Sequence, residues 1–381
     1  MKGRNTSIFS VYSIFRAIDW SLVAPALVLS ILGILTMHTF GVGASLAPRQ
    51  IIWIGVSFVV YVVLAISDLR FIKRTPIIMT GYISVLVVLF LLLVAVHPVM
   101  GARSWFILGG LSFQPADIAK LVLIILLAKY LSRRYVEIAD WRHIIVSGAY
   151  TGLLVLLVLI EPDLGTATIL GSIWLGLMLV SGISKKQLAV IGLLLLVGAT
   201  GLWFGGLKPY QRDRIVSFVN PAANRQGAGY NAYQAMIAVG SGEVFGKGIG
   251  YGTQSKLRFL PQYQTDFIFA AYAEEWGFFG VALALALYAT LLARLFAIAR
   301  KASTNFDAFF TLGVAILFLA HIVIHIGINV GLLPVTGTTT PFMSYGGSHI
   351  VMEFAALGIV TALARYGRSV PRQQAVLEYE G

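Results

Sequence analysis

The sequence contains no cysteine and few charged residues. None of its 381 residues is Cys, which excludes disulfides, thiol catalysis and metal sites built from thiolates. Charged residues make up 12% of the chain, whereas soluble domains contain about 25%. A chain with so little charge cannot cover a globular surface with polar groups. Together with a hydrophobic content of 58%, this indicates a protein that crosses a membrane several times.

Common nucleotide and metal motifs are also absent. The sequence has no P-loop, no dinucleotide-binding glycine motif and no HExxH, so we expect no ATP-driven chemistry within this chain. Its net charge is +12, but in a membrane protein the position of the charge matters more than its sum. We therefore do not predict binding to nucleic acid.

Ten apolar stretches approach the roughly 20 residues that a helix needs to cross a bilayer. They lie near 20–40, 51–67, 76–96, 117–131, 143–160, 164–181, 187–205, 266–293, 308–332 and 348–366. Lys and Arg concentrate in alternate connections, which predicts that both termini are cytoplasmic. We predict an all-α polytopic membrane protein with about ten transmembrane helices. Its parts are a cytoplasmic N-terminal tail at 1–19 without a signal peptide, one ten-span domain at 20–366, and a cytoplasmic tail at 367–381.

One connection is much longer than the others. Residues 206–265 form a predicted extracytoplasmic loop with seven basic residues and the glycine-rich run "GSGEVFGKGIGYGTQ". A loop of this length is usually functional or disordered, and a mobile linker is one interpretation. Aromatic and Leu residues recur through it, however. We therefore expect part of the loop to pack against the protein or dip into the membrane interface.

Ionisable residues gather near the predicted outer boundary of the membrane. Asp117 and Lys120 share one face of a span at i, i+3, where they form either a functional pair or a pair that only neutralises itself. Glu161 and Asp163 lie in a short turn between two spans. Asp163 can be a helix cap or a functional acid, and the motif alone does not decide between them.

A second group of acids lies around the eighth predicted span. Spacing alone makes Asp266 a helix cap at its start. Glu274 lies eight residues later, about 12 Å deeper in a straight helix, and Glu275 follows. We place these two glutamates near mid-membrane depth, as an ion relay or as a buried structural pair.

Polar residues also interrupt the last two spans. His321 and His325 have a metal-compatible i, i+4 spacing, but they lack a third ligand nearby in sequence, and we interpret them as packing residues. The stretch "NVGLLPVTGTTTPFMSYGGSHIVMEF" contains two Pro, four Gly and several hydroxyls, followed by His349 and Glu353. Backbone this irregular near a membrane is tolerated where it lines a cavity or is buried in protein.

Several long segments resemble the SEDS family (shape, elongation, division and sporulation proteins). They are "YQRDRIVSFVNP", "GSGEVFGKGIGYGTQSKLRFLPQYQTDFIFAAYAEEWG" and "GLLPVTGTTTPFMSYGGS", with "GARSWFILGG", "FQPADIAK" and "PDLGTA" in support. They occur in family order along nearly the whole chain. The "YQRDR" form and the short N-terminal tail are more similar to RodA, the elongation member, than to FtsW, the division member.

The resemblance implies a ten-span peptidoglycan glycosyltransferase of the bacterial cytoplasmic (inner) membrane. Such enzymes polymerise lipid II into glycan strands at the outer face, releasing undecaprenyl diphosphate. The implied partners are a class B penicillin-binding protein transpeptidase and other proteins of the cell-elongation complex. Two alternatives stay open from the residues: a lipid-linked sugar flippase or transporter, favoured by Glu274, Glu275 and Glu353, and a non-catalytic scaffold.

The resemblance also implies site residues. The family's essential aspartate falls on Asp266 and its conserved lysine on Lys120, and we expect both to be catalytic. The expected substrate-binding residues are Arg49, Arg103, Gln114, Asp117, Asp163, Thr265 and Ser344. A divalent cation, Mg²⁺ or Mn²⁺, held by Asp266 with Asp117 or Asp163, is a further candidate.

The chain departs from the family pattern at three places. "QPAD" replaces "QPSE", Gln262 and Gln264 replace a Glu and a His, and "TGTTTPFMSYGGSH" replaces "TGIPLPFISYGGSS". None of these changes affects Asp266 or Lys120. Partial desolvation would raise the pKa of Asp266 and a nearby Lys120 would lower it, so the sequence leaves the sign of this shift open.

Overall fold

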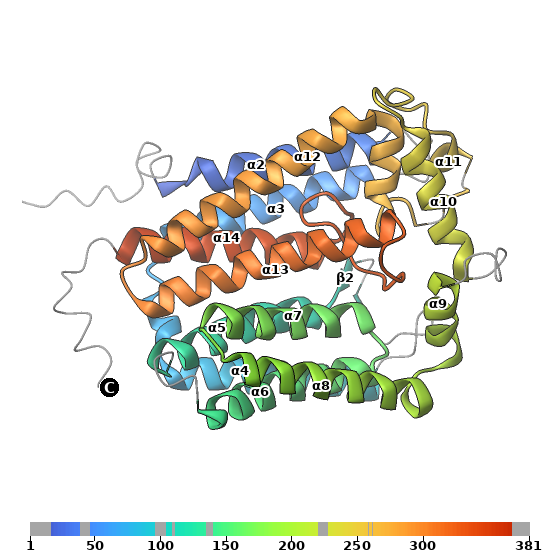
Figure 1. Cartoon of the computed structure of the whole chain (residues 1–381). Coiled ribbons are helices and arrows are strands. Elements are labelled where there is room, and N and C mark those ends of the chain that lie inside the picture. Colours follow the sequence, from blue (N-terminus) through green and yellow to red (C-terminus); the bar gives the residue numbers. More distant parts are fainter. Residues whose placement is uncertain are drawn as a thin grey trace, which may run out of the picture.

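The computed structural model describes residues 17–38, 46–95, 104–108, 111–134, 140–219, 228–257, 259–260 and 262–367. Within these ranges, ten long helices match the ten predicted apolar stretches (Figure 1). They are α2 (Trp20–His38), α3 (Ala47–Ile66), α4 (Thr75–Ala95), α5 (Pro115–Arg134), α6 (Trp141–Ile160), α7 (Leu164–Val180), α8 (Lys185–Gly201), α12 (Ile268–Arg300), α13 (Asn305–Asn329) and α14 (Gly347–Gly367). The all-α polytopic architecture is therefore confirmed. The division of the chain into two tails and one domain stays a prediction.

Helix caps explain why several of these helices begin where they do. Asp140 accepts a hydrogen bond from the Arg142 N–H at the start of α6, at 2.9 Å. Ser184 and Gln187 form a reciprocal capping box at the start of α8. Each cap satisfies backbone N–H groups that the first turn of a helix leaves without partners.

Eight of the helices are long and apolar enough to span a membrane by length and composition. The exceptions among the ten are α7, which has 17 residues, and α5, which carries five charged residues. Both pack against α13 in the interior of the bundle. Buried neighbours, rather than lipid, therefore surround much of these two helices, which explains why their sequences are less typical of a membrane span.

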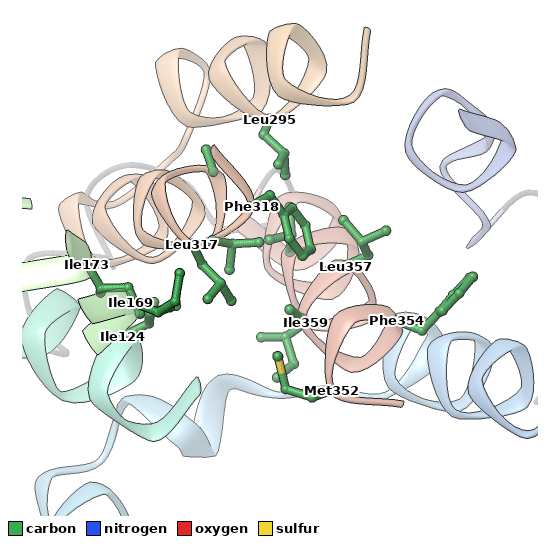
Figure 2. Close-up of a cluster of buried hydrophobic side chains, with 14 of the residues drawn as sticks. Ile124, Ile169, Ile173, Leu295, Leu317, Phe318, Met352, Phe354, Leu357 and Ile359 are labelled. Atoms are coloured by element: carbon green, nitrogen blue, oxygen red, sulfur yellow. The ribbon is translucent and has the colours of Figure 1, made fainter. Parts of the chain in front are cut away.

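The apolar core surrounds α13. Figure 2 shows Leu317 and Phe318 of α13 between Ile124 of α5 on one side and Leu357 of α14 on the other, all within one buried cluster. By contrast, α8 leaves most of its apolar side chains exposed, Leu194 at 64% among them. This pattern is typical of a membrane bundle, in which the exposed apolar faces contact lipid.

The long predicted loop is mostly helical. It contains α9 (Pro209–Val219), α10 (Ala228–Ser241) and the short α11 (Thr253–Lys256), preceded by a π-helical turn, η3 (Leu202–Gly206). Ala235 and Ala238 of α10 pack with Leu260, Phe267 and other buried residues in a second apolar cluster. The expected packing of this segment is thus confirmed, and the mobile-linker interpretation is wrong for its described residues.

Helix α12 is broken at Gly277, which has φ 63° and ψ −161°. The segment before the break lies at the end of the bundle where α10 and α11 lie (Figure 1). There the Lys247 N–H donates to the Glu274 carbonyl at 3.0 Å, and the Gly248 N–H donates to the Glu275 carbonyl at 3.1 Å. Glu274 and Glu275, directly before the break, are thus held against Lys247 and Gly248 of the external segment. Their depth in the membrane stays a prediction.

Two smaller elements complete the described fold. The antiparallel strands β1 (Phe106–Leu108) and β2 (Leu111–Phe113) form a hairpin directly before α5. The 3₁₀ turn η1 (Arg70–Lys73) connects α3 to α4 at the opposite end of the bundle and packs against α5.

Candidate functional site

A cavity of about 890 Å³ lies at the end of the bundle where α5 and α7 begin. The α9 and α10 helices, the turn before α12, and the connection between α13 and α14 contribute the rest of its walls. Six of the nine predicted catalytic and substrate-binding residues line it: Gln114, Asp117, Lys120, Asp163, Thr265 and Asp266. The fold thus brings together six polar residues from three separate parts of the chain.

Asp117 and Lys120 form a buried ion pair in the first turns of α5. The Lys120 ammonium donates to Asp117 Oδ1 at 3.0 Å, and the side chains are 3% and 1% exposed. Asp117 also accepts from Ser348 Oγ at 2.8 Å and contacts His349 Nδ1 at 3.1 Å. The carboxylate is therefore held by α5 and α14 together, and it fixes the ammonium at the cavity wall.

His349 extends this network to Glu353. Its Nε2 lies 3.0 Å from Glu353 Oε1, while Glu353 Oε2 accepts from the Phe342 N–H at 2.9 Å. One imidazole therefore stands between two buried carboxylates, Asp117 and Glu353. The sequence analysis did not predict that His349 joins Asp117 to Glu353, because the two carboxylates come together only when α5 and α14 pack.

His321 is a second histidine at this site, and its ring lies beside that of His349, with centroids 4.9 Å apart and the ring planes tilted by 51°. Its Nδ1 lies 3.2 Å from the Thr339 carbonyl, which can only accept, so Nδ1 carries the proton. The lone pair is then on Nε2. His321 lines the cavity, so its interpretation as a packing residue was incomplete.

Asp163 both caps a helix and lines the cavity. It accepts from the Thr166 N–H at 2.9 Å at the start of α7, and from Gln114 Nε2 at 3.1 Å. The two interpretations that the sequence left open are therefore compatible. Glu161, two residues earlier, is fully buried, and burial with the neighbouring Asp163 charge raises its pKa to about 8.

Asp266 lies in the turn before α12 and is half-buried at the cavity wall. Burial raises its pKa to about 6. The Arg214 charge and a hydrogen bond from Thr265 oppose this rise, while the Asp163 charge adds to it. Arg214, on α9, is a site residue that the sequence analysis missed, because only folding brings α9 to face this turn.

Ser344 supports the backbone at Asp266 and does not line the cavity. Its hydroxyl donates to the Thr265 carbonyl at 2.8 Å and accepts from the Thr340 N–H at 2.8 Å. Asn329 Nδ2 donates to the Asp266 carbonyl at 3.2 Å. The irregular segment between α13 and α14 is thus buried and lines the cavity, as its composition predicted.

The two predicted arginines have different outcomes. Arg49 is exposed on the first turn of α3 and is not part of the cavity lining. The neighbouring Gln50 is buried and donates to the Ser344 carbonyl at 3.1 Å. Arg103 lies outside the described residues, although Ser104 directly after it lines the cavity. Phosphate binding by Arg49 and Arg103 stays a prediction.

The acids of the cavity do not form an obvious metal site. Within the described ranges, no group of three or more His, Cys, Asp or Glu side chains is placed to hold a metal ion. Asp117 is already bonded to Lys120, Ser348 and His349. The contacts of Asp117 therefore do not favour a cation held by Asp266 with Asp117, and a cation held by Asp266 with Asp163 stays a prediction.

Comparison with known proteins supports a specific family. Residues 12–369 match the family of cell cycle proteins that comprises FtsW, RodA and SpoVE. The chain is 37% identical to stage V sporulation protein E of Bacillus subtilis over 70% of this chain and 73% of that protein. It is 34% identical to a probable peptidoglycan glycosyltransferase FtsW of Thiomicrospira cyclica, over 91% of each chain. It is 36% identical to the peptidoglycan glycosyltransferase MrdB of Escherichia coli K12, over 69% of this chain and 71% of that protein.

Solved structures show the same fold. A chain from a peptidoglycan synthase complex, described for its coordination of polymerization and crosslinking, matches with a TM-score of 0.78 at 32% identity. That match covers 91% of this chain and 97% of the other. The rod shape determining protein RodA of Thermus thermophilus matches with a TM-score of 0.68 at 31% identity, over 91% of this chain and 96% of that chain. The protein described here therefore belongs to the FtsW/RodA/SpoVE family, the SEDS family of multi-pass bacterial membrane proteins.

Proposed function

We propose that this chain polymerises lipid II at the outer face of the cytoplasmic membrane, with Asp266 as the general base. As a member of its family, it is a peptidoglycan glycosyltransferase. The observation that carries the assignment of the site is that Asp266 and Lys120 line the same cavity of about 890 Å³. An acid that can accept a proton and a fixed ammonium are the two groups that this reaction requires.

The reaction joins a sugar hydroxyl to an anomeric carbon that carries a lipid-linked diphosphate. A bond forms between the hydroxyl oxygen and the anomeric carbon, and the bond from that carbon to the diphosphate oxygen breaks. The hydroxyl proton passes to the Asp266 carboxylate, and the bonding electron pair leaves with the diphosphate. Asp266 suits this role because its pKa is raised to about 6. Its carboxylate is therefore a stronger base than an ordinary one, and it is still ionised near pH 7.

Positive charge at the cavity would stabilise the departing diphosphate. Lys120 lines the cavity and is held in place by Asp117, and Arg214 lies close enough to Asp266 to affect its pKa. Fixed cations stabilise a developing negative charge more strongly in a partly desolvated cavity than in water. We expect Arg103 and Arg49 to add to this charge when substrate is bound.

We include a divalent cation in this proposal only as one that enters bound to the diphosphate of the substrate. The described acids do not fit a site that needs Asp117, because Lys120 and two groups of α14 already bond to that carboxylate. Polymerisation measured with a chelator, and again after Mg²⁺ or Mn²⁺ is added back, tests this part.

We further propose that the chain acts in cell elongation together with a class B penicillin-binding protein and other proteins of the elongation complex. The likeness to a chain of a peptidoglycan synthase complex supports the partner. The elongation role is supported by the "YQRDR" segment alone, since relatives of both kinds match at similar identity and do not decide between the two roles. Restoration of rod shape, and not of septation, in cells depleted of their own elongation or division enzyme tests this role.

The decisive experiment is reconstitution of the purified full chain with lipid II. We expect glycan strands from the wild type, with and without the partner transpeptidase, and none from Asp266→Ala or Asp266→Asn. Wild-type polymerisation by a well-folded Asp266→Asn variant would refute the catalytic assignment. Lipid II translocation without polymerisation would instead support a transporter.

A further inference from the structure

A second large cavity, of about 1010 Å³, lies at the opposite end of the bundle from Asp266. Its lining comes from η1, the start of α4, the last turns of α5 and the start of α13. Asp117 and Arg133 lie sixteen residues apart on α5, so about 24 Å separates the two cavities along that helix. The second cavity is therefore independent of the site described above.

Basic side chains dominate this cavity. Arg70, Lys73, Arg74, Lys129 and Arg133 line it, and the acid among the lining residues is Asp68. Arg70 pairs with Asp68 at 2.7 Å, and Lys73 pairs with Asp307 of α13 at 2.8 Å. Among the described residues, five cations therefore gather around this cavity together with two acids, Asp68 and Asp307.

The cations repel one another in this arrangement. Lys129 and Arg133 are i, i+4 on α5, a spacing at which like charges destabilise a helix. Lys73 from η1 also lies within electrostatic range of Lys129. These like charges come from separate elements and surround one cavity. An anion of high charge density that binds there would offset their mutual repulsion and so lower the energy of the protein.

The positive-inside rule explains basic residues at this end of the bundle but does not explain their gathering. Lys185, Lys186 and Arg300 belong to other connections on the same side, and they are exposed and do not line this cavity. Orientation of the chain needs only charge in the connections. The placement of five cations around one cavity is a separate feature of the tertiary structure.

Apolar side chains adjoin the basic ones. Phe71, which lines the cavity, is 47% exposed, and Ile77 in the first turn of α4 is 40% exposed. Farther along α4, Ile83 and Val87 are also about half exposed. A ligand with a phosphate and acyl chains could place its charge among the cations and its chains along α4, whereas a soluble anion would use only the basic part.

We propose that this cytoplasmic cavity binds the phosphate headgroup of an anionic lipid of the inner leaflet. Basic pockets between transmembrane helices on the cytoplasmic side have this chemistry, because Lys and Arg side chains attract the anionic headgroups of that leaflet. Arg guanidinium groups suit phosphate because they can donate two hydrogen bonds to it.

The test uses the purified full chain in a zwitterionic detergent, with thermal unfolding as the readout of binding. The probes are short-chain phosphatidylglycerol, short-chain phosphatidylcholine and inorganic pyrophosphate. The test variant is Arg74→Gln/Lys129→Gln/Arg133→Gln. The matched control, Lys185→Gln/Lys186→Gln/Arg300→Gln, removes the same charge outside the cavity. Polymerisation of lipid II in neutral lipid checks that both variants are folded.

We expect saturable stabilisation of the wild type and the control by phosphatidylglycerol and no such effect from phosphatidylcholine. The test variant should bind at least about tenfold more weakly, given the loss of three cations. Competition by pyrophosphate at similar concentration would support a phosphate site but assign it to a soluble anion.

Equal responses of test and control variants to phosphatidylglycerol would overturn the proposal. If the triple variant does not fold, Arg74→Gln and Lys129→Gln alone should each weaken binding severalfold, and an unchanged affinity in both would overturn it equally.

Discussion

The ammonium of Lys247 lies 2.9 Å from a carboxylate oxygen of Glu274, a side chain that is fully buried. The same oxygen accepts from the Thr253 hydroxyl at 3.0 Å and from the Gln254 N–H at 3.1 Å. One buried acid therefore gathers three donors from the external segment. This explains how a segment that the sequence left as a loop is fixed above the catalytic candidate Asp266.

Replacement of Glu274 should loosen this segment. Glu274→Ala removes the acceptor of three donors, and we expect a loss of about 1–3 kcal/mol in the free energy of unfolding. Faster proteolysis within 242–257 should accompany the loss. Glu243→Gln, at an exposed position in the same segment, is the control and should change neither quantity. Equal stability of Glu274→Ala and the control would show that these contacts do not hold the segment.

Gly277 should tolerate no side chain. Its φ of 63° with ψ of −161° favours glycine strongly, and a Cβ there would lie 2.2 Å from the Gly246 nitrogen. We expect Gly277→Ala to cost at least about 2–3 kcal/mol of stability, measured by thermal unfolding in detergent. Gly192→Ala, in an open part of α8, is the matched control and should be neutral or slightly stabilising. A Gly277→Ala variant as stable as this control would contradict the observed kink.

The rate of polymerisation should rise with pH around the pKa of Asp266. A general base acts in its ionised form, so activity should increase through a midpoint of about 6 and level off above it. The Arg214 charge lowers this pKa, so Arg214→Gln should move the midpoint to higher pH. Arg212→Gln, on the same helix but outside the cavity lining, should leave the midpoint unchanged. The same rising limb in Asp266→Asn would assign the titration to another group.

A double variant separates the two interpretations of the Asp117–Lys120 pair. Lys120→Met leaves a buried carboxylate without its cation and should cost about 3–5 kcal/mol of stability. Asp117→Asn/Lys120→Met removes both charges, and we expect it to recover most of that loss in thermal unfolding. Polymerisation should stay lost in both variants if Lys120 acts on substrate. Wild-type polymerisation by the double variant would make the pair purely structural.

Glu161 should make the protein less stable as pH rises. Its pKa is about 8 in the folded state and close to 4.5 when unfolded, so the folded state binds the extra proton between these values. Stability should therefore fall from about pH 4.5 to about pH 8 and then level off with respect to this group. Glu161→Gln removes the ionisation and should be more stable than the wild type at pH 8, with little difference near pH 4.5. Parallel stability curves for the two proteins would contradict a buried, neutral Glu161.

The sequence by itself determined the membrane class, the ten helices and most of the polar residues at the cavity. Apolar runs of about 20 residues and Lys and Arg in alternate connections carry that information locally. Gln114, Asp117 and Lys120 were recognisable because they lie within one short motif at the start of a helix. The motif around Asp266 was equally local.

Tertiary structure decided which of these residues meet. The break of α12 at Gly277, where the backbone closely approaches Gly246, and the contacts of Glu274 and Glu275 with the external segment follow from no local pattern. Arg214 and His349 reach the cavity only through the packing of α9 and α14, which no local pattern encodes. Packing of the core brings residues that are distant in the chain into contact. The pKa of Asp266 and the charge that lines each cavity depend on such contacts, so the fold decided both.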